Sequence, residues 1–422
     1  MEDNELITGK IDALISEAVF SDDRQVRERS RQTIRKTALN QGIFPASIQG
    51  LYEAAGKGKY QNKTVPAINI RGITYDVARA VFRAALKDKV GPFIFEIARS
   101  EIGYTGQRPG EYAASILAAA IREGFRGPVF IQGDHFQIGR KKFGLEPEKE
   151  LNEIRELIRE AVSAGFLNID IDASTLVDIE KPTLAEQQEN NCRVTADMTR
   201  FIRDIEPKGV TISVGGEIGE IGKGNSNADD LRAFMEGYTR YLGANIKGIS
   251  KISVQTGTTH GGVVLPNGSI AKVKLNFQTL RELSSVAREE YGIGGAVQHG
   301  ASTLPDDAFG MFAKVNALEV HLATGFQNII YDSPHFPKEL LNEVYSGLTA
   351  KYSDERKEGE TEEQFLYKTR KKGFGDFKKE FWNIPEDNLS KIGEELEDRF
   401  SLLFGSLNVV ETIDLINQFV AH

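Results

Sequence analysis

The feature that most constrains the fold of this sequence is an alternation of short apolar runs with amphipathic segments, which begins near residue 64. Eight runs rich in Val, Ile or Phe have the length of buried strands, and they cover residues 64–70, 91–97, 127–133, 166–172, 209–215, 251–257, 294–300 and 317–323. Apolar residues fall on both faces of each run, as in a parallel sheet that is covered on both sides. The sequence therefore predicts eight buried parallel strands.

Helices are predicted between these runs. The clearest covers 151–166, where one apolar stripe is formed by Leu151, Ile154, Leu157, Ile158, Ala161 and Val162. Pro147 precedes this segment and Gly165 ends it, as helix boundaries require. Further helices are predicted over 73–88, 109–124 and 185–205. Eight strands that alternate with helices over about 260 residues match a (β/α)8 barrel, which typically has ~250 residues.

A doubly wound open sheet is the alternative architecture. Such a sheet carries a Gly-rich phosphate-binding turn after its first strand, whereas only Gly72 follows the first run here. The Gly-rich segment 215–227 is not a P-loop, because Glu217 stands six residues before Lys223 and Gly224 replaces the Ser or Thr. We therefore predict an α/β protein with a (β/α)8 TIM barrel over 63–335. An N-terminal helical segment (1–62) precedes it and a C-terminal helical extension (336–422) follows it.

Composition limits the partners and the kind of metal site. Sixty-one acidic against 52 basic residues give a net charge of -9, the wrong sign for binding a nucleic-acid backbone. The start of the chain lacks the basic and apolar regions of a signal peptide, and the apolar run 113–121 is too short to span a bilayer. We expect a cytoplasmic protein without nucleic-acid or membrane partners. Because Cys192 is the only cysteine, any metal must be bound by His and carboxylates.

Polar side chains stand at or just beyond the carboxyl ends of the predicted strands, where the active residues of barrels lie. In chain order they are Asn69, Glu96, Asp134, His135, Asp170, Asp172, Glu217, His260, His299 and His321. Each has an ordinary structural explanation on its own, but several imidazoles and carboxylates that converge on one site are costly to bury without a cation. Three imidazoles with one open position describe a catalytic zinc site. The small neighbours in GDHF, TTHGG and QHGAS would let backbone N–H groups hold a phosphate.

Five runs carry a family resemblance over about residues 64–330: TVPAINI, GDHFQIGRKK, VGGEIGEIG, QTGTTHGG and QHGAST. In this order and spacing they resemble the metal-dependent (class II) fructose-bisphosphate aldolases and their tagatose-bisphosphate relatives. A further segment, EIARSEIGYTGQRPGEY followed by GDH, is similar to the barrel-shaped accessory subunits of bacterial tagatose-bisphosphate aldolase. The chain thus resembles a divergent member of this family.

The resemblance implies a metal site and an acid/base. His135, His260 and His299 would bind zinc (Zn2+), with Glu217 as an alternate ligand or a carboxylate that supports one. Asp134 would exchange the proton of the aldehyde oxygen. Zinc would polarise the ketose carbonyl and stabilise the enediolate, so no Schiff-base lysine is required. Imidazole also suits other divalent metals.

The resemblance also implies the substrate contacts. Asn69 would contact the bound triose, and Gly261, Gly300 and Ser302 would hold a phosphate beside a monovalent cation. The basic segment 140–142 either contacts phosphate or begins a solvated helix. A positive site is needed locally because the whole chain is acidic.

Two stretches depart from the family pattern. Where the family has Asn-x-Asp-Thr-Asp after the last strand, residues 321–325 read His-Leu-Ala-Thr-Gly, which keeps only Thr324 and offers His321 as a replacement donor or as a packed structural residue. The family's acidic loop after the fifth strand, the one that precedes Glu217, is also altered, which leaves three acidic residues as possible bases: Glu220, Asp229 and Asp230.

The resemblance implies reversible aldol cleavage of fructose 1,6-bisphosphate to glycerone phosphate and glyceraldehyde 3-phosphate, an activity of glycolysis and gluconeogenesis. Two alternatives stay open. The substrate could be tagatose 1,6-bisphosphate or another phosphorylated ketose, or the chain could be a non-catalytic barrel subunit of such an aldolase. The resemblance further implies a homodimer or homotetramer.

Overall fold

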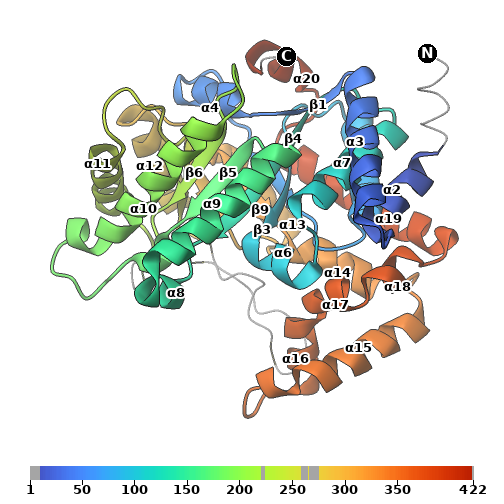
Figure 1. Cartoon of the computed structure of the whole chain (residues 1–422). Helices are drawn as coiled ribbons and strands as arrows, with labels where there is room; N and C mark the ends of the chain where they lie inside the picture. Colours follow the sequence, from blue (N-terminus) through green and yellow to red (C-terminus); the bar gives the residue numbers. More distant parts are fainter. Residues whose placement is uncertain (1–9, 220–223, 258–264, 266–274, 421–422) are drawn as a thin grey trace.

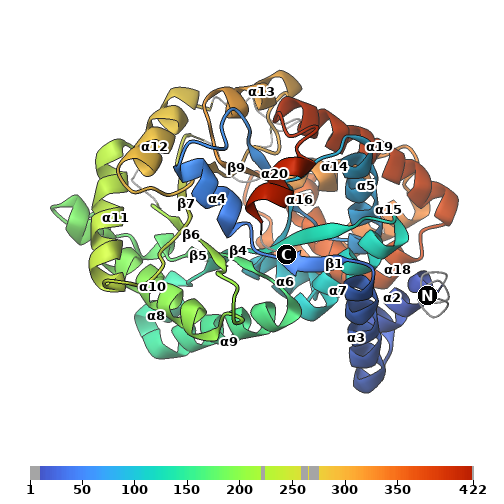
Figure 2. The same ribbon diagram turned by 90° about the horizontal axis from the view of Figure 1, so that it is seen from above.

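Eight parallel strands form a closed barrel in the computed structural model, which describes residues 10–219, 224–257, 265 and 275–420 (Figures 1 and 2). The strands are β2 (Val65–Asn69), β3 (Ile94–Ala98), β4 (Gly127–Gln137), β5 (Asn168–Asp172), β6 (Ser213–Glu217), β7 (Lys251–Val254), β8 (Ala296–Gln298) and β9 (Glu319–Leu322). The ring closes because β2 pairs with both β3 and β9, and β4 pairs with both β3 and β5. The eight predicted strands and the TIM barrel are confirmed.

Helices surround the barrel. The predicted ones are present as α5 (Thr74–Lys87), α7 (Pro109–Arg122), α9 (Pro147–Ala164) and α10 (Leu184–Ile205), and they are joined by α6 (Arg99–Thr105), α8 (Arg140–Leu145), α11 (Ala228–Leu242), α12 (Phe277–Glu289), α13 (Asp306–Lys314) and α14 (Thr324–Asp332). The stripe of α9 is buried against the barrel, and the helix stops at Gly165, whose φ of 101° suits glycine. Among the described residues, no helix combines the length and the apolar character that crossing a membrane demands.

The N-terminal segment contains a strand in addition to the expected helices. Its helices are α2 (Ile11–Phe20), α3 (Arg24–Asn40) and α4 (Gln49–Gly56), and β1 (Ile43–Ala46) lies between the last two. β1 pairs in parallel with the first residues of β4, from Gly127 to Phe130. β5 pairs with β4 only from Gln132 onwards, so β1 supplies the partner that the long β4 otherwise lacks at its start. The prediction of helix throughout 1–62 is therefore wrong at 43–46.

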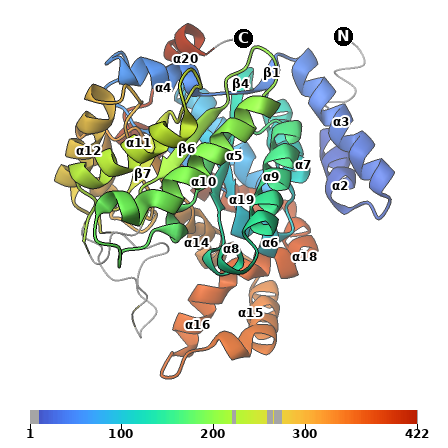
Figure 3. The same ribbon diagram turned by 60° about the vertical axis from the view of Figure 1, so that its left-hand side comes forward.

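The C-terminal extension runs along the full height of the barrel. It contains α15 (Lys338–Tyr352), α16 (Glu362–Thr369), α17 (Gly373–Asp376), α18 (Lys378–Trp382), α19 (Glu386–Ser406) and α20 (Ile413–Phe419). We call the end of the barrel at the carboxyl ends of the strands the mouth, and α17 contacts α6 near it. α19 packs against α5, and α20 packs against α4 at the opposite end of the barrel. Figure 3 shows α15 and α16 far from α4 and α20. A separate apolar cluster that includes Tyr52, Leu318, Ile416 and Val420 closes that opposite end.

Candidate active site

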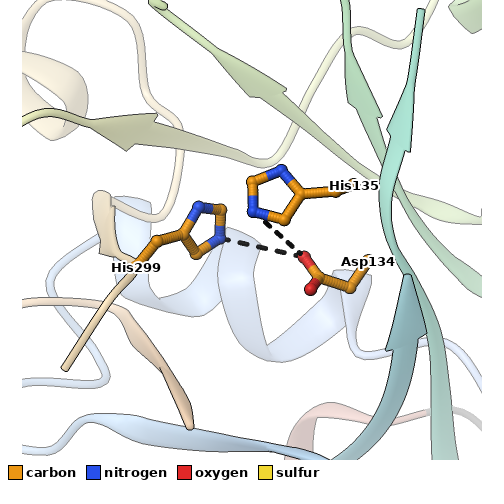
Figure 4. A group of neighbouring side chains, drawn as sticks. All are labelled: Asp134, His135 and His299. Carbon is orange, nitrogen blue, oxygen red and sulfur yellow. Dashed lines mark ion pairs between the residues drawn. The ribbon is translucent and has the colours of Figure 1, made fainter. Parts of the chain in front are cut away.

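A bulge in β4 places two neighbouring residues, Asp134 and His135, at the mouth. The pairing of β4 with β5 shifts register between Gly133 and Phe136, which gives β4 one residue more than its partner. His135 has a φ of 40°, in the left-handed region that side chains rarely adopt. Consecutive strand residues ordinarily point to opposite faces, whereas a bulge can turn both toward one side. Figure 4 shows both side chains directed toward His299.

His135 is held by carboxylates from two neighbouring strands. Its Nδ1 forms a 3.0 Å hydrogen bond with Asp172 Oδ2 of β5 and lies 3.3 Å from Glu217 Oε2 at the end of β6. Its Nε2 lies 3.9 Å from Asp134 Oδ1. An imidazole that binds a metal through one nitrogen usually gives the other to a carboxylate, and Asp172 is such a partner for Nδ1 of His135.

The last two strands of the barrel position two more imidazoles. His299, directly after β8, lies with its ring centroid 4.2 Å from that of His135, and its Nε2 is 3.9 Å from Asp134 Oδ1 (Figure 4). The His321 ring in β9 lies 4.1 Å from His299. Three of the four histidines predicted at strand ends therefore converge on one place.

The donor atoms of Asp134, His135 and His299 lie close enough to share one cation, all within 4.8 Å of one another. The donors of His135, Asp172 and Glu217 meet the same limit. These groups are buried or nearly so, and they combine imidazole with carboxylate, a donor set that suits a divalent transition metal. The described residues therefore fit a divalent metal ion, without identifying which one.

Three of the predicted site residues, Glu220, His260 and Gly261, lie outside the described residues. His260 is the third predicted zinc ligand, Gly261 is a predicted phosphate contact, and Glu220 is one of the possible bases. Their roles stay predictions. The two other possible bases, Asp229 and Asp230, lie in the first turn of α11. Asp230 caps that helix by accepting a hydrogen bond from the backbone N–H of Asn227.

The remaining predicted residues line one cavity of about 770 Å³ together with Asp134, His135 and His299. They are Asn69, Gly300, Ser302, His321 and Thr324. Ser302 Oγ accepts a 2.7 Å hydrogen bond from the N–H of Ala323, which ties the loop after β8 to the end of β9. The structure brings these residues together around one cavity, while their roles and their contacts with substrate stay predictions.

Basic side chains line the same cavity. They are the three residues of segment 140–142, Arg71, and Lys371 of the C-terminal extension. Arg71 donates to Glu101 Oε1 at 2.8 Å and to Gln327 Oε1 at 2.9 Å. Glu101 also accepts a 2.6 Å hydrogen bond from Asn69. Sequence reasoning does not single out Lys371, because its neighbours form a charged segment typical of a solvated helix.

The carboxylates around His135 change its protonation. Burial alone would lower the pKa of His135, but Asp134, Glu217 and Asp172 raise it well above its ordinary value. Burial alone would raise the pKa of Asp172, but the hydrogen bond with His135 lowers it. Burial and the charge of Asp172 raise the pKa of Glu217. A metal ion among these groups would take over the balancing charge from the proton.

Charged side chains continue below the mouth into the barrel interior. Burial and the charge of Asp134 raise the pKa of Glu96 to about 7, and burial raises that of Asp170 to about 6. Burial alone would raise the pKa of Glu319, but Lys251 and His321 lower it below its ordinary range. Lys251 and Glu319 each stand at the first position of a buried strand, far from the carboxyl ends at which sequence reasoning looks for site residues.

Comparison with known proteins gives a family match. The model of the family described as fructose-bisphosphate aldolase class-II matches residues 46–379. None of the curated proteins compared with the chain matches it.

Solved structures share the fold at low identity. A fructuronate-tagaturonate epimerase from Cohnella laeviribosi is 11% identical, with a TM-score of 0.60 over 90% of this chain and 85% of that chain. A probable tagatose 6 phosphate kinase from Sinorhizobium meliloti 1021 is 18% identical, with a TM-score of 0.54 over 85% and 91%. A fructose-bisphosphate aldolase from Campylobacter jejuni is 19% identical, with a TM-score of 0.52 over 87% and 96%. At such identities the likeness concerns the fold.

Proposed function

The chain belongs to the class-II fructose-bisphosphate aldolase family, whose model matches most of its length, and from this premise we propose that it is a zinc-dependent aldolase that reversibly cleaves fructose 1,6-bisphosphate. The products are glycerone phosphate and glyceraldehyde 3-phosphate. The observation that carries the proposal is the convergence of His135 and His299 at the mouth, with the Asp134 carboxylate 3.9 Å from a ring nitrogen of each. The low identity to solved aldolases makes this chain a divergent member.

His135 and His299 hold the metal in this proposal, with His260 as the third predicted ligand and Glu217 beside them. A divalent cation bound there supplies the Lewis acid that a ketose carbonyl needs before its C3–C4 bond can break. Asp172 keeps Nδ1 of His135 engaged, so that Nε2 faces the cavity. This fixed orientation reduces the reorganisation that metal binding requires.

Asp134 takes the proton of the C4 hydroxyl during cleavage and returns it during condensation. Its carboxylate lines the cavity beside both imidazoles, within the reach that general acid–base catalysis requires. Gly300, Ser302 and Thr324 bind one phosphate at the loops after β8 and β9, beside a monovalent cation. Arg71, partly buried and held by Glu101, adds a positive charge to the wall of the same cavity.

Metal analysis and an aldol-cleavage assay on the purified chain test the proposal. We expect bound zinc and turnover in the wild type, and loss of both in His135→Ala. His335→Ala is the matched control. His335 does not line the cavity, and it donates to Ser333 and accepts from Asn388 through its backbone. Turnover that survives full chelation, or that is unchanged in His135→Ala, would falsify the proposal. A purified chain that binds zinc but turns over no ketose would instead support the non-catalytic subunit.

A second candidate is the same cleavage of another ketose, such as tagatose 1,6-bisphosphate. The observation that favours it is the altered stretch 321–325, because His321 stands where the family has Asn and contacts carboxylates through both ring nitrogens. A substrate panel separates the candidates. It should include ketose bisphosphates of both C4 configurations and the sugar acids fructuronate and tagaturonate, because the epimerase among the fold relatives is named for them. A kcat/KM at least about tenfold higher for one substrate, or about 1.4 kcal/mol, identifies it.

A further inference from the structure

A column of charged side chains fills the barrel beneath the proposed metal site. Lys251 at the start of β7 is 1% exposed, and Glu319 at the start of β9 and Glu96 in β3 are fully buried. The interior of a (β/α)8 barrel is ordinarily packed with branched apolar side chains. A buried charge is tolerated only where it has partners of opposite charge or hydrogen-bonding groups. The contacts of each charged side chain therefore explain how this column is tolerated.

Lys251 is held by acceptors from three other strands. Its Nζ lies 2.9 Å from Asp170 Oδ2 of β5, donates a 2.8 Å hydrogen bond to Gln132 Oε1 of β4, and donates to Glu319 Oε1 of β9. An ammonium group has three N–H donors, and three acceptors surround this one. On its far side, Glu319 accepts a hydrogen bond from the Tyr52 hydroxyl of α4. The ammonium group therefore has one defined position.

Glu319 connects Lys251 to the mouth. The same Oε1 that accepts from Lys251 lies 2.6 Å from His321 Nε2. The other ring nitrogen of His321, Nδ1, lies 3.0 Å from Glu96 Oε2 and 3.3 Å from Asp134 Oδ1. An unbroken series of short contacts thus runs from Lys251 through Glu319 and His321 to Asp134.

The lower part of the column is not a second metal site. Donor atoms of Asp170, Glu319 and His321 lie close enough together to hold an ion. However, the ammonium group of Lys251 contacts both Asp170 and Glu319 and already supplies the cation between them. A divalent ion in the same place would be strongly repelled by the ammonium group.

We propose that Lys251 is a positioning residue of this active site, which acts through Glu319 and His321 to hold Asp134 in its working orientation. The inference rests on the proposed function, in which Asp134 exchanges the substrate proton. Without the ammonium group, Asp170 and Glu319 would be two buried carboxylates facing one imidazole. His321 Nε2 is already 3.9 Å from Asp170, so the ring would be drawn down into the barrel and away from Asp134.

The first test is Lys251→Met in the zinc-loaded enzyme, with Arg203→Met as the matched control. Arg203 is also a largely buried cation with a carboxylate partner, Glu206, but it lies on the outer helix α10. We expect Lys251→Met to lower kcat by about tenfold or more while KM and zinc content stay within about threefold, because a small displacement of an acid/base costs rate rather than binding. Arg203→Met should leave kcat within about threefold. A kcat that is equally unaffected in both variants overturns the proposal.

The double variant Lys251→Met/Glu319→Gln separates positioning from stability. It removes one positive and one negative buried charge together, so the double variant should fold even where the single one does not. Because the series of contacts to His321 stays broken, we expect its kcat to remain about tenfold or more below that of the wild type. Recovery of wild-type kcat together with wild-type stability would mean that Lys251 only stabilises the barrel.

A spectroscopic measurement tests the column without relying on turnover. In 15N-histidine-labelled holoenzyme, the His321 resonances are identified by their loss in His321→Asn. We expect them to shift in the double variant and to stay in place in Arg203→Met. If the wild type cleaves no ketose, the proposed function fails, yet this shift still supports the link between Lys251 and His321. An unchanged His321 resonance overturns it.

Discussion

At the scale of single residues, the acid/base role rests on Asp134. We expect Asp134→Asn to lower kcat by about 10²–10⁴, because the amide keeps the shape of the carboxylate but cannot accept the C4 proton. Zinc content should stay near that of the wild type, since His135 and His299 are unchanged. Steady-state kinetics and metal analysis measure both, with Asp197→Asn on α10 as the control. Loss of zinc in proportion to kcat would show that Asp134 acts mainly as a ligand.

The residue types of the site could be predicted because they follow strand ends, which hydrophobic patterning locates. Asp134, His135 and His299 were identified in this way. Lys251 and Glu319 cannot be identified in this way, because each stands at the beginning of its strand. Only the closed ring brings Lys251 of β7 to Glu319 of β9, two strands away. Their pairing depends on the barrel radius and on side-chain reach, which no local pattern contains.

At the scale of elements, the bulge in β4 depends on Gly133. A Cβ on Gly133 would lie 2.4 Å from the ring of Phe136, the residue at which pairing with β5 resumes. We expect Gly133→Ala to lower the free energy of unfolding by about 1–3 kcal/mol, and to weaken zinc binding because the shifted ring displaces Asp134 and His135. Denaturant titration and metal titration measure the two effects.

A control variant and a compensating variant test whether the loss comes from the added methyl group of Gly133→Ala. Gly144→Ala is the control, because a Cβ there meets no atom within 4 Å. Gly133→Ala combined with Phe136→Leu makes room for the methyl group and should recover part of the zinc affinity. Zinc affinity that is unchanged in Gly133→Ala would separate the bulge from the metal site. The bulge itself could not be predicted, because one extra residue in a strand leaves the hydrophobic pattern of GPVFIQG intact.

A buried carboxylate on α5, that of Asp76, predicts an effect of pH on stability. Burial raises the pKa of Asp76 in α5 to about 6, above the ordinary value for an aspartate, although Arg79 opposes the shift. The folded state therefore holds this proton more tightly than the unfolded state. The stability that protonated Asp76 contributes to the folded state is fully present below the pKa of Asp76 in the unfolded chain. It is lost as pH rises through about 6, the pKa in the folded state.

Asp76→Asn should remove this pH dependence. At pH 8 we expect its free energy of unfolding to exceed that of the wild type by about 1–2 kcal/mol, because no buried carboxylate has to be ionised. Urea titrations between pH 4 and pH 8 measure the difference, and the exposed Asp22→Asn should follow the wild-type curve. An Asp76→Asn protein that is less stable than the wild type at every pH would show that the ion pair with Arg79 outweighs the cost of burial.

At the scale of the whole molecule, the C-terminal extension contributes to both ends of the barrel. Lys371 lines the cavity at the mouth, whereas Ile416 and Val420 belong to the apolar cluster at the other end. Between them, α19 packs against α5. The helical character of 336–422 was predictable from composition and length. Its path was not, because it depends on apolar faces of α5 and α4 that lie some 300 residues away in sequence.

We expect the barrel and the extension to unfold as one unit. The only tryptophan, Trp382, lies in α18, with its ring centroid 5.3 Å from Phe20 and 6.4 Å from Tyr75, so its fluorescence reports the contact of the extension with α2 and α5. Far-UV circular dichroism reports the helices of the whole chain. Coincident denaturation midpoints by the two probes are the expected result.

Two adjacent leucines of α19, one buried and one exposed, provide a matched pair of variants for this test. Leu403 is 2% exposed and Leu402 is 38% exposed. Leu403→Ala should lower the free energy of unfolding by about 2–5 kcal/mol and move both midpoints together, because it opens a cavity in the apolar core shared with the barrel. Leu402→Ala should change it by no more than about 0.5 kcal/mol. A fluorescence transition that moves ahead of the dichroism transition in Leu403→Ala would show that 336–422 unfolds independently, as a separate domain boundary near 335 requires.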